Sequence, residues 1–385
     1  MSCRKILILD TSCAGHHLEY IHHLYEAATL IDDGTKYVFA VPETFLQKGK
    51  LLNWSDSSNV SFYYLSSEEC ESGNGFFSNI KRSRIVRDAV MRVKPSDVVF
   101  ITLMAFVPFI SLFIPRKVKI SGIIYKVYLY HWRDAKWLIR LKQLICYSMM
   151  SRMKQYRNLY VLNDATSSKI LNRVWQTDKF KYLPDPLAID AKLENLTRPA
   201  NLPHEGSKTI FLHAGGMDMR KGTMTVFNII SRLSNEQRKK MCFVFAGVVT
   251  DALKEKFYEA YSRRKDDCEI IIYDEFCSYE FLASLCKYSN YLLLPYKNTD
   301  MSSGIIAYGA YCGTPVIVPD SGLLGKLVRH HKIGVGIKGD FVESFLMMAD
   351  ELCKKSQPSK SNYIETHSTE AFTSIMLEKR GFCDE

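Results

Sequence analysis

Short apolar runs alternate with amphipathic helical patterns along most of the chain, and this alternation constrains the fold more than any other feature. Runs such as Lys5 to Leu9 and Asp97 to Thr102 have the length and apolar content of buried strands. Between such runs, apolar residues recur at helical spacing, as from Leu18 to Leu30. Strands that alternate with helices form parallel sheets, so the sequence predicts an α/β protein.

The alternation occurs in two series. In the first half we predict strands at 5–9, 37–41, 97–102, 126–130 and 159–162, with helices at 18–30 and from about residue 167. In the second half we predict strands at 209–213, 242–246, 269–273, 291–294, 315–318 and 334–337, with helices at 223–233, 253–263 and 278–286. A final helix is predicted over roughly residues 369–380.

The segment from Tyr182 to Pro186 interrupts this pattern. Its sequence, YLPDP, contains two prolines, and a polar stretch follows to about Ser207. Because proline disfavours regular structure around it, we interpret this segment as a linker. We predict two Rossmann-like domains, residues 1–190 and 195–360. If the two domains face a cleft, a ligand would bind at the carboxyl ends of their strands.

The composition favours an anionic partner. The chain has 51 Lys and Arg against 41 Asp and Glu, a net charge of +10. Nucleotides, other polyanions or an anionic membrane face suit such an excess, and a merely basic soluble protein is the alternative. The 11 cysteines show no CxxC spacing and no Cys/His cluster, which argues against a zinc site. Such cysteines, with no signal-peptide pattern, predict a cytoplasmic location.

A glycine-rich turn with a basic pair follows the first strand of the second series. The sequence HAGGMDMRKGT contains Gly215, Gly216, Arg220 and Lys221, and a helix is predicted to begin near its end. The glycines allow a ligand to approach the backbone closely. The two cations could neutralise a diphosphate, Arg through its fork and Lys as a point charge. The alternative is a tight strand-to-helix turn with a solvated basic pair.

A second such turn lies between Tyr291 and Pro319. An apolar strand ends in a polar loop, and Ser302, Ser303 and Gly304 open a helix of small and apolar residues. Unpaired amides of Ser303, Gly304 and Ile305 could bind phosphate oxygens, helped by the helix dipole. An ordinary serine N-cap is the alternative.

Residues 209–340 resemble the nucleotide-binding domain of retaining GT-B glycosyltransferases, especially those of family 4. The matching features, in order, are the turn at Gly215–Gly222, Pro295-Tyr296 after a strand, Gly304 at a helix start, and Gly313–Ile317 entering a strand. The resemblance implies the GT-B fold, with the terminal segment 365–385 packing back on the first domain. It also implies sugar transfer from a nucleoside diphosphate sugar with retention at the anomeric carbon.

The chain departs from the family at three positions. The family has two glutamates seven residues apart around this helix, and Met301 and Tyr308 stand there. Neither can act as a carboxylate, so the ribose and sugar contacts of the family's glutamates must be made differently here. Tyr308 and Asp300, the nearest acidic residue, are the candidates for these contacts. The family's arginine before the Lys-Gly pair falls on Gly216, so Arg220 would have to replace it.

The first half resembles the family more loosely. Gly15 matches a glycine-rich loop near the donor phosphate and the acceptor, and His131 matches a histidine that touches the donor sugar. An ordinary surface or core histidine is the alternative for His131. His16 or His17 would line the cleft as a polar contact or act as the base for the acceptor hydroxyl. For the base we choose His17. A metal bound between His16 and His23 is the disfavoured alternative.

Phe276 follows the predicted strand at 269–273. In the resembling family this loop lies near the nucleotide base. Phe276 would therefore either stack on the base or pack in the core.

Two basic and apolar stretches, Ile80–Lys94 and Trp137–Arg157, lie in the first half. Their mixture of large apolar residues with Lys and Arg is typical of a helix resting on an anionic membrane surface. A solvated helix with one apolar face toward the core is the alternative. The run from Leu103 to Ile114 has only 12 residues, too few to span a bilayer.

The sequence therefore predicts a glycosyltransferase, with His131, His17 and Lys221 as candidate catalytic residues. The donor would be a UDP- or GDP-type sugar and the acceptor a saccharide or lipid-linked saccharide, in surface glycan synthesis. We expect no metal, no nucleic-acid partner, and a cytoplasmic location with peripheral contact at the inner membrane face. A catalytically silent nucleotide-sugar-binding subunit and a nucleotide-sugar 2-epimerase are the alternatives.

Overall fold

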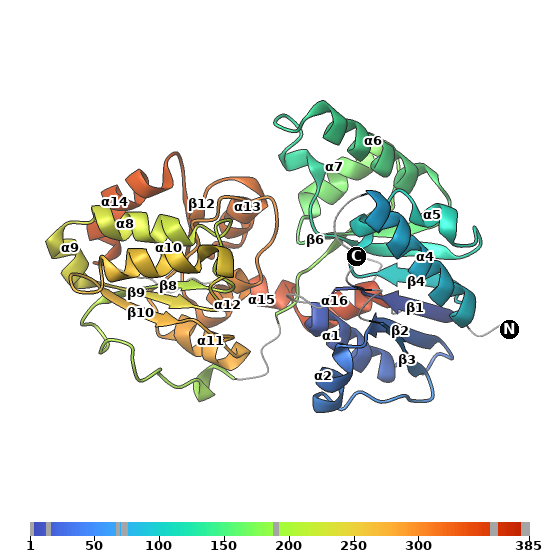
Figure 1. Cartoon of the computed structure of the whole chain (residues 1–385), viewed down its shortest axis with the longest axis horizontal. Helices are drawn as coiled ribbons and strands as arrows, with labels where there is room; N and C mark the ends of the chain where they lie inside the picture. Colours follow the sequence, from blue (N-terminus) through green and yellow to red (C-terminus); the bar gives the residue numbers. More distant parts are fainter. Residues whose placement is uncertain are drawn as a thin grey trace. The chain divides into compact units, whose positions relative to one another are not determined.

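The computed structural model describes residues 4–12, 17–66, 70, 76–187, 192–354 and 361–378. The chain divides into two compact units, shown in Figure 1. The first unit comprises Met1–Asp185 and Thr369–Glu385, and the second comprises Pro186–Ser368. The change of unit falls within the proline-containing segment YLPDP.

The first unit is built on a parallel sheet of seven strands in the order β3-β2-β1-β4-β5-β6-β7. Its strands are β1 (Lys5–Leu9), β2 (Lys36–Pro42), β3 (Val60–Leu65), β4 (Asp97–Phe100), β5 (Lys119–Ile124), β6 (Tyr156–Leu162) and β7 (Phe180–Leu183). Its helices are α1 (His17–Thr29), α2 (Phe45–Leu51), α4 (Phe76–Val93), α5 (Ile110–Phe113), α6 (Trp137–Arg152), α7 (Ala165–Trp175) and α16 (Thr369–Met376). Short 3-10 turns are η1 (Leu103–Ala105) and η2 (Tyr128–Tyr130).

Strand β1 reads as an uninterrupted apolar run because both faces of this sheet are covered. Leu7 and Leu9 pack with residues of α4 to α7 on one face, whereas Ile6 and Ile8 pack with α1, α2 and α16 on the other. Figure 1 shows these two helical layers on opposite sides of the sheet. The alternation of side chains along a strand thus divides one apolar run between two cores.

The second unit has a six-stranded parallel sheet in the order β10-β9-β8-β11-β12-β13. Its strands are β8 (Thr209–Ala214), β9 (Met241–Ala246), β10 (Glu269–Tyr273), β11 (Tyr291–Leu293), β12 (Val316–Pro319) and β13 (Gly334–Ile337). Its helices are α8 (Thr223–Arg232), α9 (Asn235–Lys240), α10 (Asp251–Ser262), α11 (Tyr279–Lys287), α12 (Ile305–Cys312), α13 (Gly322–His331), α14 (Phe341–Leu352) and α15 (Tyr363–Thr366), with a 3-10 turn η3 (Leu193–Asn195). Helices α8, α10 and α14 lie on one face, and α11 and α12 lie on the other (Figure 1).

The strand predicted at 126–130 is wrong. That segment is the turn η2, and the strand lies upstream as β5, where Lys119 pairs with Asp97 of β4. Gly122 lowers the strand propensity of β5, but a Cβ there would lie 2.7 Å from the Phe100 carbonyl oxygen. The glycine is therefore required by the close approach of β4, which a local pattern does not reveal.

Ion pairs and hydrogen bonds attach the end of the described chain to the first unit. Glu378 accepts from Arg4 at 2.8 Å and from Asn158 at 2.7 Å, and it pairs with Arg157 at 3.1 Å. Asp97 pairs with both arginines at 3.3 Å. Just before this cluster, α16 contributes buried apolar residues to the same core as α1. The last helix thus belongs to the first unit.

Candidate functional site

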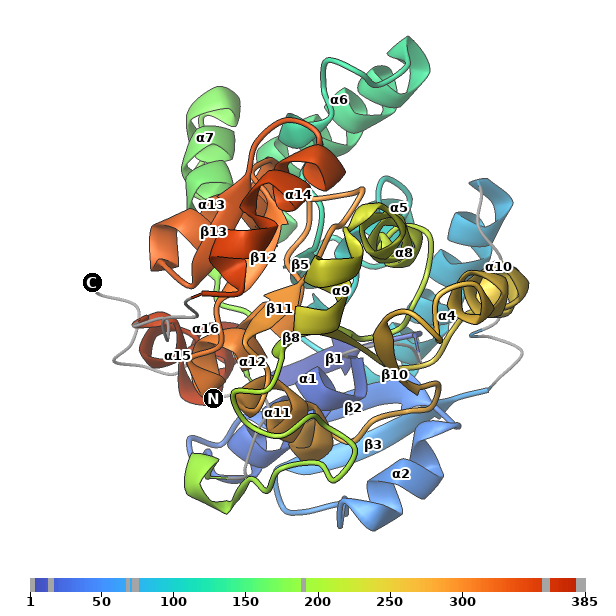
Figure 2. The same cartoon turned by 90° about the vertical axis from the view of Figure 1, so that its left-hand side faces the viewer.

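The predicted phosphate-binding turns lie next to each other in the second unit. Strands β8 and β11 are hydrogen-bonded neighbours, and Figure 2 shows them side by side. The chain leaves the carboxyl end of β8 into Gly215 and the carboxyl end of β11 into Pro295. The amide of Lys297 donates to the carbonyl of Arg220 at 2.9 Å, which joins the two turns directly.

Two glycines make this juxtaposition possible. Gly215 and Gly222 have φ angles of 97° and 74°, which favour glycine. A Cβ on Gly222 would lie 1.9 Å from the carbonyl oxygen of Pro295, so a side chain cannot fit between the turns. At Gly216, in contrast, a Cβ would meet no atom within 4 Å. The space beside Gly216 is therefore open to a ligand.

Lys221 points its ammonium group into the corner between the two turns. Its Nζ lies 6.0 Å from the centre of the Tyr296 ring, and a Cβ on Gly215 would approach that Nζ to 2.7 Å. The Tyr296 hydroxyl is 3.1 Å from the Ser303 hydroxyl. In the part of the chain that the structure describes, no carboxylate pairs with Lys221. An unneutralised, half-buried cation of this kind suits an anionic ligand.

Asp218 organises the loop that carries these cations. Its carboxylate accepts from the Lys221 amide at 2.7 Å and lies 3.4 Å from the Arg220 guanidinium. The Arg220 charge is thus partly balanced within its own loop, unlike that of Lys221. Asp218 was not predicted from the sequence. An aspartate whose carboxylate can accept the amide three residues later is, however, a local signal for such a turn.

His213 fixes the base of the same turn. Its ring nitrogens lie 3.0 Å from the Leu293 carbonyl and 3.1 Å from the Thr223 hydroxyl. Burial lowers the pKa of His213 to about 4, so the ring is neutral near pH 7. His213 therefore connects β8, β11 and the start of α8 without adding charge.

The start of α12 offers free backbone donors. Amides of Ile306 and Ala307 donate to the carbonyls of Ser303 and Gly304, each at 3.0 Å. The amides of Ser303, Gly304 and Ile305 have no acceptor among the described residues, as expected for the first turn of a helix. Tyr296 links them to Lys221, because its ring lies under the ammonium and its hydroxyl contacts Ser303. The amides and Lys221 could therefore bind oxygens of one diphosphate.

The other residues predicted to contact the nucleotide-sugar donor differ from one another in how far they are buried. Tyr308 is buried in α12, whereas Asp300 and Ser302 are half-buried in the preceding loop. Phe276 is 79% exposed, so of the two alternatives considered for it, packing in the core is wrong. Met219 and Val248, which follow β8 and β9, are also exposed apolar residues. They follow the carboxyl ends of β8 and β9, as Phe276 follows the carboxyl end of β10.

In the first unit, the candidate base His17 is held by a buried carboxylate. Its Nδ1 lies 2.7 Å from Oδ2 of Asp10, which follows β1 and is 1% exposed. The other carboxylate oxygen accepts from the Ser12 amide at 3.0 Å. The ring of Tyr125, just after β5, stacks on His17 with centroids 6.1 Å apart. A carboxylate that orients an imidazole leaves the second ring nitrogen available for proton transfer.

Two other residues predicted in this half are not part of the Asp10–His17 pair. Gly15 lies outside the described residues. His131 ends η2, seven residues after β5, and its Nε2 lies 3.0 Å from the Gln143 amide of α6. It therefore does not end a strand, because the strand predicted before it does not form.

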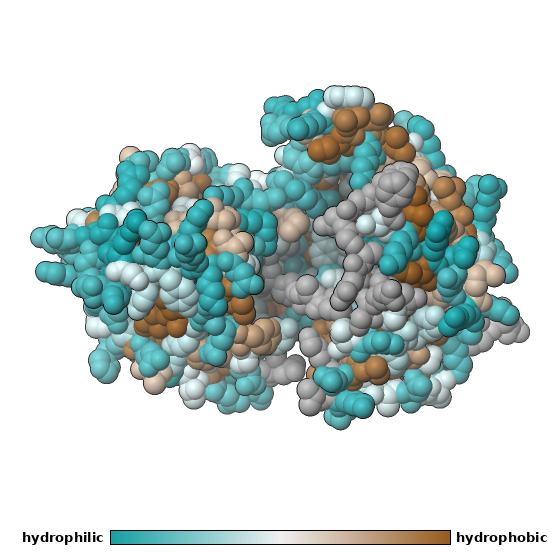
Figure 3. All heavy atoms as spheres, viewed as in Figure 1, coloured by the Kyte–Doolittle hydropathy of each residue, from teal (hydrophilic) through white to brown (hydrophobic). Residues whose placement is uncertain are grey.

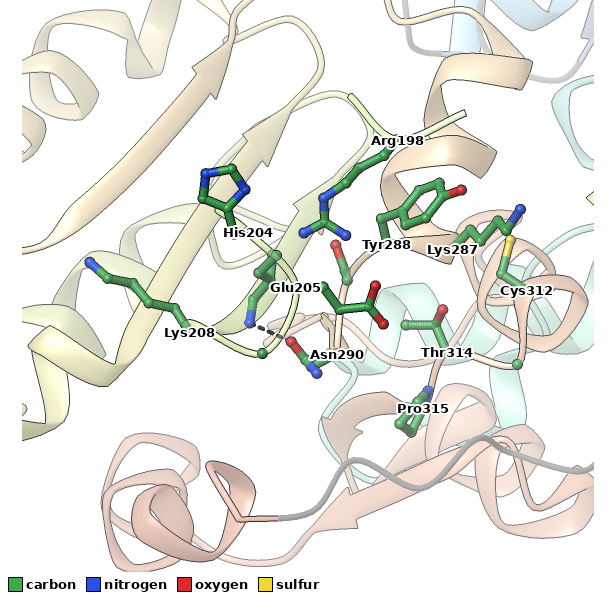
Figure 4. A pocket seen from close by; sticks show the side chains of 14 residues that line it. Arg198, His204, Glu205, Lys208, Lys287, Tyr288, Asn290, Cys312, Thr314 and Pro315 are labelled. Carbon is green, nitrogen blue, oxygen red and sulfur yellow. Dashed lines mark hydrogen bonds between the residues drawn. The ribbon is translucent and has the colours of Figure 1, made fainter. Parts of the chain in front are cut away.

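Figure 4 shows a pocket of about 330 Å³ at the amino ends of β8 and β11, the sheet edge opposite Lys221. Arg198, Lys208 and Lys287 line it together with Glu205. Lys208 pairs with Glu269 at 2.7 Å. Arg198 and Lys287 lie 5.3 and 5.1 Å from the centre of the Tyr288 ring, and Lys287 donates to the Leu193 carbonyl at 2.7 Å. An anion in this pocket would therefore meet the Glu205 carboxylate as well as the cations.

Neither a metal cluster nor a spanning helix occurs within the described ranges. No group of three or more His, Cys, Asp or Glu side chains there is arranged to hold a metal ion. Among the helices described, none has both the length and the apolar character to cross a bilayer.

Comparison with known proteins gives matches only at the level of structure. No family model and no curated protein sequence matches. WaaG, a glycosyltransferase involved in lipopolysaccharide biosynthesis, is 13% identical over 97% of this chain and 98% of its own, with a TM-score of 0.64. HepE from Anabaena, solved in complex with UDP and glucose, is 10% identical over 97% and 98%, with a TM-score of 0.67. Sucrose-phosphate synthase from Thermosynechococcus elongatus is 14% identical over 97% and 98%, with a TM-score of 0.68.

A protein described as a UDP-N-acetylglucosamine 2-epimerase, from Listeria monocytogenes, matches with a lower TM-score of 0.59. It is 11% identical over 98% of this chain and 94% of its own. At such identities the likeness is one of fold. The two parallel sheets and their helices confirm the predicted α/β fold of the GT-B glycosyltransferases.

Proposed function

We propose that the chain is a glycosyltransferase that moves a sugar from a nucleoside diphosphate sugar to a saccharide or lipid-linked acceptor. The observation that carries the proposal is the junction of the two turns after β8 and β11. There, the uncompensated ammonium of Lys221 lies over the ring of Tyr296, whose hydroxyl contacts Ser303 at the start of α12. A diphosphate has the charge and the acceptor oxygens that this junction lacks.

In the proposed reaction, the bond between the sugar's anomeric carbon and the diphosphate breaks while a bond to the acceptor oxygen forms. Lys221 and the amides of Ser303 to Ile305 would stabilise the charge that develops on the leaving diphosphate. These groups can do so without a metal ion, and we propose a reaction that needs none. His17 would take the proton of the acceptor hydroxyl at its Nε2.

The stereochemistry follows from how the acceptor attacks. The family resemblance implies retention, which is our expectation. Attack from the face on which the diphosphate leaves would keep the anomeric configuration, whereas attack from the opposite face would invert it. The anomeric configuration of the product, read by NMR, distinguishes the two.

The base of the donor would lie at the sheet edge beside the diphosphate site. The exposed side chains of Met219, Val248 and Phe276 offer apolar surface on which a flat base could stack. A fold shared with HepE, which was solved with UDP-glucose, supports a UDP-type donor. A lipid-linked acceptor would place the chain at the cytoplasmic face of a membrane, in surface glycan synthesis.

The direct experiment is an assay of diphosphate release with a panel of nucleotide sugars, with and without saccharide and lipid-linked acceptors. We expect release that requires an acceptor and one preferred donor. Tight nucleotide-sugar binding without turnover on any acceptor would instead support the binding-subunit alternative, which the absence of both family glutamates motivates. Inversion at C2 of the free donor would support the epimerase alternative, with which the chain shares a fold.

A separate prediction concerns Asp10. We expect Asp10→Asn to lower kcat while leaving the KM for the donor unchanged, because the substitution removes the carboxylate that holds the His17 ring in place. His330→Gln, at an exposed histidine of α13, serves as the control. Equal kcat values in wild type and Asp10→Asn would remove His17 from the proposed mechanism.

A further inference from the structure

Helix α6 leaves most of the apolar residues from Trp137 to Ile145 outside the core. Trp137, Leu138, Ile139, Leu141, Leu144 and Ile145 are between 41% and 68% exposed, and we call them the α6 patch. The buried residues of α6, Cys146, Tyr147, Met150 and Ser151, all lie in its second half. In Figure 3, apolar side chains gather over α6 at the upper right. A solvated helix with one apolar face toward the core, the alternative considered from the sequence, would not expose this set.

The α6 patch borders a groove of about 640 Å³. Leu138, Leu141 and Ile145 form one wall, and residues of α4 and of the segment around η1 form the other, including Met104 and Phe109. Contiguous apolar surface of this kind on a soluble domain usually marks a contact site.

The charges around the patch are mostly positive. From Arg133 to Arg157 the sequence has seven Lys or Arg and one Asp. From Phe76 to Lys94, which includes α4, it has six Lys or Arg and one Asp. No described carboxylate pairs with Lys136, Lys142 or Arg84. The partner that complements this surface is therefore both apolar and anionic.

We propose that the α6 patch docks the chain on the surface of an anionic lipid bilayer. The large apolar side chains would enter the boundary between headgroups and acyl chains, while Lys136 and Lys142 would contact anionic headgroups. The exposed indole of Trp137 suits that boundary, where tryptophan is enriched. A second copy of the chain fits less well, because a symmetric contact would bring two cationic surfaces together.

Vesicle sedimentation with the full-length protein tests this proposal without any sugar donor or acceptor. We expect binding to vesicles of phosphatidylcholine and phosphatidylglycerol in equal parts, little binding to phosphatidylcholine alone, and loss of binding at high salt. The triple variant Leu138→Ser/Leu141→Ser/Ile145→Ser should bind at least roughly tenfold more weakly, because three large apolar side chains are removed from the contact. Its unfolding temperature should be unchanged, because these side chains lie outside the core.

A matched control replaces three exposed apolar residues elsewhere, Leu30→Ser/Val174→Ser/Met347→Ser, and should bind like the wild type. A second readout is tryptophan fluorescence, whose blue shift on anionic vesicles should disappear in Trp137→Phe. Equal vesicle binding by the two triple variants, or equal binding to neutral and anionic vesicles, would overturn the proposal. So would absence of vesicle binding together with a dimer that only the α6 triple variant disrupts.

The outcome is distinguishable from that of the proposed glycosyltransferase function. With a soluble saccharide acceptor, the α6 triple variant should keep the wild-type rate, because it leaves the junction after β8 and β11 intact. Failure of the vesicle experiment therefore leaves the proposed transferase standing, and failure of the transferase assay leaves the docking proposal standing.

Discussion

Lys221→Ala is expected to lower kcat/KM for the nucleotide sugar by at least roughly tenfold, which corresponds to about 1.4 kcal/mol or more of lost transition-state stabilisation. The loss should be large because the Lys221 ammonium has no carboxylate partner in the described structure and so remains available to a diphosphate. Binding of the free nucleoside diphosphate, measured by calorimetry, should weaken as well. Diphosphate release under single-turnover conditions measures the chemical step.

Arg220→Ala is the matched comparison for Lys221→Ala. Arg220 lies in the same turn, but its guanidinium is beside Asp218. We therefore expect a smaller loss of activity from Arg220→Ala than from Lys221→Ala. Neither change should alter the unfolding temperature by more than a degree or two, since both side chains lie near the surface. An unchanged rate and unchanged nucleotide affinity in Lys221→Ala would refute the assignment of Lys221 to the diphosphate.

Gly222→Ala is the second substitution with a large expected effect, and it acts on the fold of the site. The new Cβ would lie 1.9 Å from the Pro295 carbonyl oxygen, and the residue has a φ of 74°. Backbone must move, so we expect the second unit to lose about 2 kcal/mol or more of stability. Thermal unfolding followed by circular dichroism measures the loss, and donor binding should fall with it.

Gly216→Ala separates the steric argument from the functional one. A Cβ at this position meets no protein atom within 4 Å, so the stability of the fold should stay at the wild-type value. If a phosphate approaches the backbone there, the methyl group will obstruct it and donor affinity will fall. A large drop in unfolding temperature for Gly216→Ala, or none for Gly222→Ala, would contradict the geometry described for this turn.

The sequence predicts the second unit well because its strands end at strong local signals. Gly215 follows β8, Gly247 follows β9 and Gly313 precedes β12, and all three have positive φ angles. The first unit is less predictable. In β5 the interior Gly122 weakens the sequence pattern of a buried strand. The aromatic residues of η2, in contrast, have the sequence pattern of a strand although they form a turn. Which segment pairs with β4 is decided by tertiary contacts, which no local pattern contains.

The residues of the candidate site differ in the same way: some are predictable from local sequence, and others depend on tertiary contacts. Lys221, Gly215 and Gly304 could be proposed from sequence because the turn chemistry at a strand end is local. The pairing of Asp10 with His17 could not, because it depends on where the start of α1 lies relative to the end of β1. A carboxylate directly after the apolar run of β1 was the available signal. The exposure of Phe276 likewise depends on packing rather than on its own hydrophobicity.

The attachment of α16 to the first unit has a consequence for synthesis on the ribosome. Phe372, Met376 and Leu377 complete a core whose other residues lie between Ile6 and Leu183, and Glu378 pairs with Arg4 and Arg157. The first unit therefore remains incomplete until α16 has been synthesised, whereas the second unit can already fold around its own sheet. During that interval the apolar face of α1 lacks its cover. A nascent chain arrested before residue 369 should consequently be a better chaperone substrate than the released protein.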